Sequence, residues 1–240
     1  MAVKIEVCVD TSASLAAAVQ GGADRVELCS ALALGGLTPS AGFMAEAGRL
    51  PVQVFAMIRP RAGDFVFAEA EVAQMETDIA TARQHGLAGV VLGASLPDGR
   101  LDAPTLARLL RAADGLQATL HRAFDLTPDQ PAAVETAIEL GFGCILTSGG
   151  ALSAVEGAAQ IKALITQATG RIVIMPGSGV SAGNAAGFVA MGARWLHASC
   201  TTSVPTPDRA AAMGFGPKDE RRTDPALVRA LRQSADKALH

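Results

Sequence analysis

The segment Gly21–Ser30 decides the fold, and it reads GGADRVELCS. Two glycines are typical of the end of a helix, and the residues after them alternate as those of a short strand do. On that strand, Val26 and Leu28 point to one side. Glu27 and Cys29 point to the other side, although buried parallel strands are normally apolar on both faces. These two side chains therefore need neighbours from elsewhere in the chain that explain their position.

The pattern of a glycine followed by a strand recurs three times, at residues 86–92, 141–146 and 192–197. In each copy a glycine ends a helix and a strand begins about three residues later. The copies are spaced two strand–helix units apart along the chain. This spacing predicts a barrel with fourfold pseudo-repetition.

Short apolar strands alternate with helical patterns from end to end. The expected strands are Lys4–Val9, Arg25–Cys29, Gln53–Ile58, Gly89–Leu92, Gln117–His121, Cys144–Thr147, Arg171–Met175 and Trp195–Ala198. The expected helices are 12–21, 40–49, 69–85, 103–113, 130–140, 154–168 and 183–191. This α/β order predicts a (β/α)8 TIM-type barrel in a single domain. An open doubly wound sheet is the competing fold, but residues 10–14 lack its glycine-rich fingerprint.

The barrel is expected to occupy residues 1–203. Residues 204–223 are rich in proline, glycine, alanine and charge, which predicts a loop: a mobile lid over the barrel mouth or a disordered connector. Residues 224–240 are expected to form an extra C-terminal helix packed on the barrel. Asp224 is its N-cap, Pro225 takes its first position, and it ends near Lys237.

Composition narrows the possible partners. The 240 residues carry a net charge of -3 with no basic run, which argues against nucleic acid as a partner. Apolar runs have the length of strands, so no membrane span is expected. The first residues lead directly into a strand without the features of an export signal, which predicts a cytoplasmic protein. The four cysteines have no C-x-x-C spacing and are expected to be reduced.

Active sites of this fold gather at the carboxyl ends of the strands. The polar side chains expected there are Glu6, Cys8, Asp10, Glu27, Cys29, Arg59, Arg61, His121, Asp125 and Ser199. Because an unpaired buried charge is costly, Glu6, Glu27 and Arg59 are expected to be paired inside the barrel. Two interpretations stay open, namely a structural ion-pair network and a binding site.

Thiols form the first candidate site. In a closed barrel the last strand pairs with the first, so Cys8, Cys29 and Cys200 come from three neighbouring strands. Soft thiolates favour Cu(I) or zinc, and two are enough for Cu(I), which makes Cys8 and Cys29 the candidate metal ligands. The alternative is that they are small buried apolar residues, as is expected for Cys144 at the opposite rim.

An anion site is the second candidate. Loops after the last two strands of a barrel often bind phosphate through backbone N–H groups, and here they contain Gly177, Gly179 and Ser199. Arg59 or Arg61 would add positive charge. A simple tight turn is the alternative for the two glycines.

An enzyme would also need proton-transfer groups. His121 is the candidate general acid or base, with Asp125 or Glu27 to orient it. The alternative is a histidine whose hydrogen bonds are satisfied within the fold.

Several ordered motifs resemble the CutC copper homeostasis family, between about Val3 and Ser199. The matching segments are residues 6–10 (EVCVD), 22–30 (GADRVELCS), 36–40 (GLTPS), 57–61 (MIRPR), 63–65 (GDF), 121–125 (HRAFD), 146–149 (LTSG) and 175–177 (MPG). The resemblance implies a TIM-type barrel, a cytoplasmic location, a homo-oligomer (dimer or tetramer) and a role in copper handling. Its proposed copper ligands fall on Cys8 and Cys29. Two residues depart from the pattern: Ser178 stands where another glycine is expected, and Cys200 lies outside the family motif.

Two functions follow as hypotheses. The first is copper homeostasis through Cu(I) bound by Cys8 and Cys29. The alternative is an enzyme for a small anionic metabolite, phosphorylated or carboxylated. In that case, the anion would be held by Arg59, Arg61, Gly177, Gly179 and Ser199, and the acid–base candidates would be Glu27, His121 and Asp125.

Overall fold

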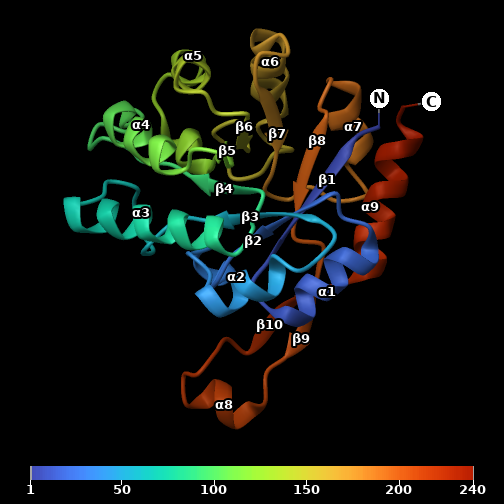
Figure 1. Ribbon diagram of the computed structural model, residues 1–240. Helices are drawn as coiled ribbons and strands as arrows, with labels where there is room; N and C mark the ends of the chain where they lie inside the picture. Colours follow the sequence, from blue (N-terminus) through green and yellow to red (C-terminus); the bar gives the residue numbers. More distant parts are fainter. Residues whose placement is uncertain (1, 240) are drawn as a thin grey trace.

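Eight parallel strands form the centre of the protein in the computed structural model, which describes residues 2–239 (Figure 1). They are β1 (Lys4–Val9), β2 (Arg25–Leu28), β3 (Gln53–Met57), β4 (Gly89–Leu92), β5 (Gln117–Leu120), β6 (Cys144–Thr147), β7 (Val173–Pro176) and β8 (Trp195–Ala198). Strands that are neighbours in the chain pair with each other from β1 to β7, and β8 pairs with β1. Within the described residues no ladder joins β7 to β8, so the barrel is nearly closed. The predicted (β/α)8 TIM-type barrel is confirmed.

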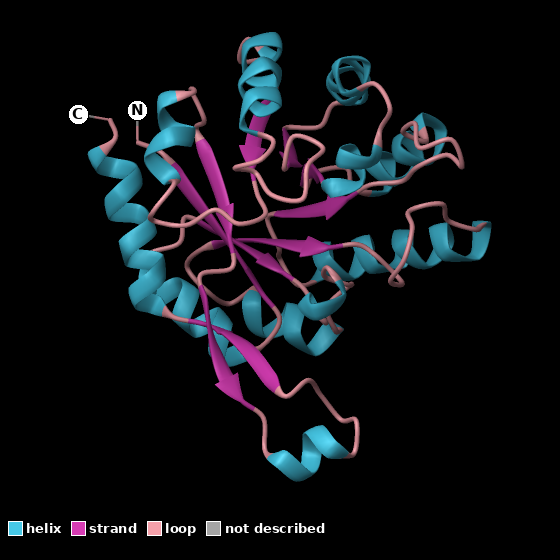
Figure 2. Ribbon diagram, turned by 180° about the vertical axis from the view of Figure 1, so that it is seen from behind, coloured by secondary structure: helices cyan, strands magenta, loops and turns pink. Residues whose placement is uncertain are grey.

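Helices surround the strands on the outside (Figure 2). They are α1 (Ser12–Gly21), α2 (Ala41–Ala47), α3 (Glu69–Gln84), α4 (Ala103–Ala112), α5 (Gln130–Leu140), α6 (Ala158–Ala168), α7 (Ala185–Ala190) and α9 (Pro225–Lys237), with short 3₁₀ turns η1 (Leu32–Leu34) and η2 (Arg122–Leu126). Helix α6 begins four residues later than predicted. Its expected first residue, Ala154, instead donates its N–H to the Ser178 carbonyl 2.9 Å away and holds the loop after β7.

The recurring glycines explain how helices give way to strands. Gly22, Gly86, Gly141 and Gly192 have φ angles between 73° and 99°, the left-handed region that a side chain disfavours. Strands β2, β4, β6 and β8 each begin three residues after one of them. The predicted repeat is therefore a helix-ending device used in every second unit.

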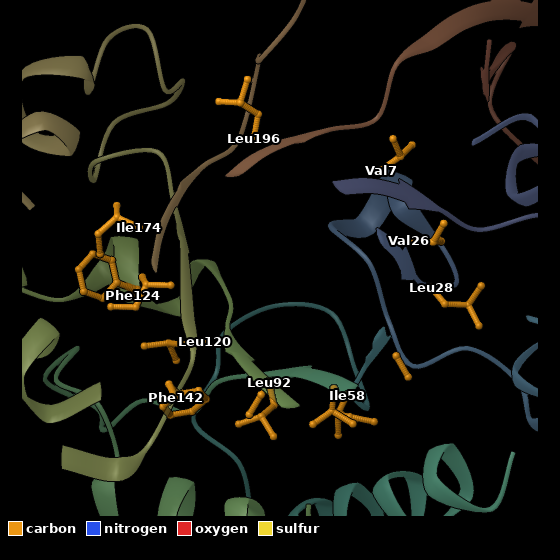
Figure 3. Packing of buried hydrophobic residues seen from close by; sticks show 14 of the residues in the cluster. Val7, Val26, Leu28, Ile58, Leu92, Leu120, Phe124, Phe142, Ile174 and Leu196 are labelled. Carbon is orange, nitrogen blue, oxygen red and sulfur yellow. The ribbon is translucent and has the colours of Figure 1, made fainter. Parts of the chain in front are cut away.

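The main apolar core lies between the strands and the helices (Figure 3). Alternate strand residues such as Val7, Val26 and Leu28 point outward and are fully buried beneath the helices. Each fully buried side chain of this size contributes about 1.5–3 kcal/mol. The other strand residues point into the barrel, where two smaller apolar clusters leave room for polar groups.

The segment predicted as a loop contains regular structure. Strands β9 (Thr201–Pro205) and β10 (Asp219–Thr223) pair antiparallel, with α8 (Asp208–Ala212) between them. This hairpin extends away from the barrel (Figure 1). Its side chains are largely exposed on both faces, so it lacks the apolar alternation by which a strand is recognised in a sequence.

Helix α9 follows the hairpin and runs beside α1 and α7. Asp224 accepts a hydrogen bond from the Ala226 N–H, and Pro225 takes the first helical position. A Cβ atom added to Gly21 of α1 would lie 2.4 Å from Val228 Cβ, so the two helices touch at a glycine. No helix in residues 2–239 has the length and apolar character that crossing a membrane requires.

Candidate functional site

Strand pairing brings acidic, basic and thiol side chains together inside the barrel. In the β1–β2 ladder Cys8 lies opposite Glu27, and in the β1–β8 ladder Glu6 lies opposite His197. All four side chains are buried. Because alternate residues of a strand share a face, Glu6 and Cys8 both point inward, one layer apart.

Cys8, Glu27 and His197 form a cluster of possible metal ligands. Each offers one donor atom, and the three atoms lie within 4.8 Å of one another. His197 Nε2 is 3.8 Å from Glu27 Oε2. A thiolate, an imidazole and a carboxylate form a donor set that suits Cu(I), through the softer ligands, or zinc.

Glu6 contacts the Nδ1 side of the His197 ring, and Arg25 in turn pairs with Glu6. The Glu6 Oε1 atom is 2.8 Å from His197 Nδ1, and its other oxygen pairs with Arg25. The Arg25 guanidinium lies between the rings of Phe55 and Trp195, 4.2 Å and 4.1 Å from their centroids. A carboxylate on Nδ1 directs Nε2 of a ligating histidine toward the metal, and this arrangement therefore fits a metal centre.

Burial is the largest single influence on the pKa values of the ionisable side chains in and beside this cluster. It raises the pKa of Glu27 to about 7, although His197 acts in the opposite direction. Burial by itself lowers the pKa of His197, but Cys8 and Glu27 outweigh it and raise that pKa well above its usual value. Burial, and then Glu27, raise the pKa of Cys29 well above its usual value. A metal bound by Cys29 must therefore displace its proton.

Cys29 lies beside the cluster. Its thiol donates to Glu27 Oε2 at 3.7 Å and is fully buried against Phe55, Met57 and Val91. The Cys8–Glu27–His197 cluster itself does not include it. Cys200 is half-buried at the barrel mouth, and Cys144 is buried at the opposite end of the barrel.

A cavity of about 570 Å³ opens at the barrel mouth above the cluster. Six residues predicted from the sequence line it, namely Cys8, Glu27, Arg59, His121, Gly179 and Ser199. Arg122 of η2 and Arg221 of the hairpin also reach it. Among the lining residues there are three arginines and one carboxylate, so the charge of the cavity wall favours an anion.

Arg59 is placed differently from the prediction that it pairs with a carboxylate. Its guanidinium donates to three backbone carbonyls, those of Leu34 (2.9 Å), Gly36 (3.2 Å) and Gly63 (2.9 Å). Its Nε atom is buried and has no hydrogen-bond partner among residues 2–239. The predicted pairing inside the barrel is confirmed for Glu6, which pairs with Arg25 and His197, and for Glu27, which faces His197. It was wrong for Arg59 alone, because those partners lie on other strands.

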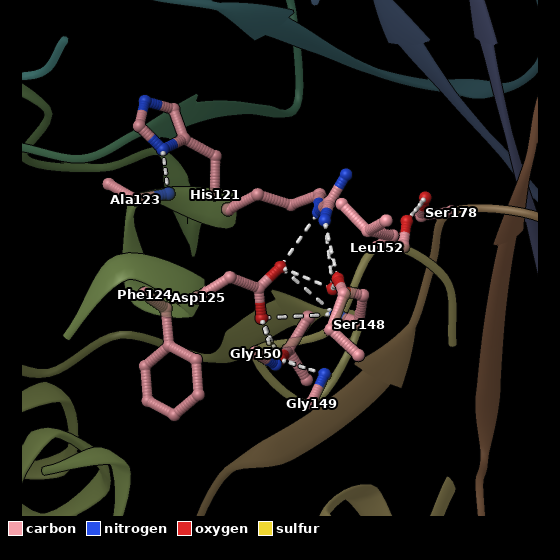
Figure 4. Close-up of polar contacts among 12 residues, drawn as sticks. His121, Ala123, Phe124, Asp125, Ser148, Gly149, Gly150, Leu152 and Ser178 are labelled. Carbon is pink, nitrogen blue, oxygen red and sulfur yellow. Dashed lines mark hydrogen bonds and ion pairs between the residues drawn. The ribbon is translucent and has the colours of Figure 1, made fainter. Parts of the chain in front are cut away.

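His121 lies at the wall of the same cavity. Its Nδ1 accepts the Ala123 N–H at 3.1 Å, which leaves the proton of the neutral ring on Nε2 (Figure 4). Burial, with the nearby charge of Arg59, lowers the pKa of His121 to about 3. The ring is therefore a neutral donor near pH 7. Its Nε2 has no partner among the described residues.

Asp125 is occupied by the fold itself. Its two carboxylate oxygens accept hydrogen bonds from Thr147, Ser148, Gly150 and Arg122 (Figure 4). They join η2 to the loop after β6. The carboxylate has no place in orienting His121, whose ring nitrogen bonds to the backbone of Ala123.

The remaining anion candidates are distributed between the cavity and its surroundings. Arg61 pairs with Glu71 at 2.5 Å and Asp64 at 2.9 Å, outside the cavity lining. Gly177 donates its N–H to the Thr147 carbonyl in the strand ladder. Ser199 and Gly179 line the cavity.

Ser178, which departs from the family pattern, has a φ of 75°. Its hydroxyl donates to the Leu152 carbonyl at 2.9 Å (Figure 4). The serine thus occupies the left-handed conformation that explains why a glycine is expected there.

Residues 3–202 match the family model described as the CutC family. A family protein CutC of Sinorhizobium medicae is 56% identical over 234 residues, which cover 97% of this chain and 96% of the relative. A relative of the same name from Rhizobium meliloti is 53% identical over 236 residues, 98% of this chain and 96% of the relative.

Among solved structures, a CutC from Streptococcus agalactiae with a provisional copper homeostasis assignment superposes with a TM-score of 0.79 at 35% identity. The match covers 82% of this chain and 98% of that one. A phosphoribosylanthranilate isomerase from Thermotoga maritima, at 14% identity and a TM-score of 0.57 over 98% of this chain and 99% of that one, shares the fold alone. The family model matches most of the chain and the two relatives cover nearly all of it, and the protein belongs to the CutC family.

Proposed function

We propose that this protein acts in copper homeostasis by binding Cu(I) at the mouth of its barrel. Cys8 supplies a sulfur ligand and His197 a nitrogen ligand, and Cys29, which lies beside their cluster, supplies the second sulfur. The observation that carries this proposal is the buried cluster of Cys8, Glu27 and His197, with donor atoms within 4.8 Å. Membership of the CutC family and the copper assignment of the Streptococcus agalactiae relative support it.

The chemistry of the cluster agrees with this role. Cu(I) prefers thiolate and imidazole over carboxylate, so Glu27 is the weakest of the nearby donors for this ion. Glu27 instead accepts the proton that Cys29 loses when the metal binds, since the Cys29 thiol already donates a hydrogen bond to Glu27. The recessed position of the sulfurs favours storage or scavenging over rapid exchange with a partner. The free thiols agree with work in a reducing cytoplasm.

Anaerobic competition with a coloured Cu(I) chelator tests the proposal. The reduced protein should take up Cu(I), and the Cys8→Ser/Cys29→Ser variant should lose affinity by at least about tenfold, since metal sites lose 10–100-fold even through changes next to their ligands. The matched control is Cys144→Ser, which removes a buried thiol at the opposite end of the barrel. Equal uptake by the double variant and the parent would refute the assignment.

A second candidate is an enzyme for a small organic anion. The observation that favours it is Glu27 Oε1, a buried carboxylate oxygen at the cavity with no partner among residues 2–239. Glu27 would move the proton. In deuterated water, a pool of small phosphorylated and carboxylated compounds should then exchange hydrogen, and Glu27→Gln should slow exchange about 10²–10⁴-fold. No exchange in any compound would end this alternative.

A further inference from the structure

Two N–H donors at the cavity wall are buried and unsatisfied, Arg59 Nε and His121 Nε2. The two residues are only 6% and 3% exposed, so water does not solvate the donors freely. A buried donor without an acceptor costs about 1–3 kcal/mol. Two such costs in one cavity wall require a physical reason, and a ligand that supplies the missing acceptors is one.

Both residues contact the same aromatic ring. The Arg59 guanidinium carbon is 4.9 Å from the Phe65 ring centroid, and the His121 ring centroid is 4.7 Å from it. Phe65 follows β3 and also lines the cavity. Arg59, Phe65 and His121 therefore form one cluster at the cavity.

The donors are held in place by bonds that leave them free for a ligand. Three carbonyls occupy the terminal nitrogens of Arg59, and the Ala123 N–H occupies Nδ1 of His121. What remains is the Nε2–H of His121 and two of the five N–H groups of Arg59, one on Nε and one on the terminal nitrogen that donates to Gly63. Arg59 has no carboxylate partner, so its charge is not neutralised within the described chain.

We propose that Arg59 and His121 form a binding subsite for the carboxylate of a small organic acid, beside the thiol cluster. The Nε–H of Arg59 serves one oxygen of a carboxylate and the Nε2–H of His121 serves the other. Phe65, Met57 and Leu146 line the same cavity and would contact the carbon skeleton of the acid. This subsite does not depend on the thiols that the copper proposal uses.

Calorimetric titration of the reduced, metal-free protein with acetate, pyruvate, succinate and inorganic phosphate tests the subsite. At least one carboxylate should bind saturably, and Arg59→Met should weaken that binding at least about tenfold, the loss of one charged hydrogen bond. Arg61→Met is the matched control, because Arg61 is already paired with Asp64 and Glu71. Uptake of Cu(I) by Arg59→Met should equal that of the parent.

A second measurement covers the case in which Arg59→Met does not fold. In parent protein with ¹⁵N-labelled histidine, the bound carboxylate should shift the Nε2 signal of His121, and His121→Asn identifies that signal. The subsite is refuted if no carboxylate binds, if phosphate alone binds, or if binding leaves this signal unchanged. None of these results bears on Cu(I) uptake, so the two proposals fail separately.

Discussion

Arg25 and Arg59 are two buried arginines of the same barrel with opposite surroundings. Arg25 begins β2, pairs with Glu6 and lies between two aromatic rings. Arg59 follows β3 and meets only carbonyls and one ring. Burial opposes the charge of both, yet Glu6 raises the pKa of Arg25, while burial and then Arg61 lower that of Arg59.

The difference follows the two ends of the barrel. At the amino end of the strands, Glu6 neutralises the charge of Arg25, although Arg25 also lines a cavity there. At the carboxyl end, the charge of Arg59 stays available beside a cavity. A buried arginine therefore indicates a binding site only where no counter-ion neutralises its charge.

Removal of Glu6 should have the largest effect on stability. Glu6→Gln leaves Arg25 without its counter-ion and takes the carboxylate from His197, so the free energy of unfolding should fall by about 3–5 kcal/mol. Urea denaturation measures it. The double variant Glu6→Gln/Arg25→Met should recover part of the loss, because it removes the orphaned charge. A loss below about 1 kcal/mol would show that the pairing of Glu6 with Arg25 contributes little to stability at the amino end of the barrel.

His121, at the mouth, should make the protein sensitive to acid. Its pKa is about 3 in the folded state against about 6.5 when unfolded, so below pH 6.5 the unfolded chain takes up a proton that the folded chain refuses. Stability therefore falls as the pH falls, by about 1.6 kcal/mol between pH 6.5 and pH 5 from this residue alone. Denaturation of His121→Asn and of the parent at both pH values measures this loss. The free energy of unfolding of the variant should fall by correspondingly less than that of the parent. If the variant and the parent lose the same free energy of unfolding between the two pH values, the pKa of His121 is not lowered in the folded state.

Arg61 should show the smallest effect, although it lies two residues from Arg59. Its ion pairs with Asp64 and Glu71 are at the surface, where such pairs contribute little. The thermal midpoint of Arg61→Gln should stay within the error of the parent at moderate salt. A clear fall in that midpoint would place Arg61 with Arg25 as a stabilising group.

The fold followed from local patterns. The left-handed glycines and the alternating strands each depend on a few adjacent residues, so they can be recognised in the sequence. Alternation also assigned Glu27 to the inside of the barrel. The hairpin of residues 201–223 was not recognised, because a strand exposed on both faces has no apolar period.

The membership of the site was harder to predict. His197 was missed as a candidate ligand, although pairing the last strand with the first would have placed it opposite Glu6. The partners of Arg59 and Asp125 could not be derived at all. Long side chains reach across several strands, and which acceptor they meet depends on the loops above the barrel.

The sequence by itself determined the eight strands, the barrel and the side of each strand that faces its interior, because these depend on residue periods of two and on local helix ends. Only the tertiary structure decided which charges are satisfied. It joined Glu6 to Arg25 and His197, and it left the Arg59 and His121 donors buried beside the cavity without hydrogen-bond partners among residues 2–239. Hydrogen-bond partners are set by distances of a few ångströms between segments far apart in the chain, and no local pattern contains those distances.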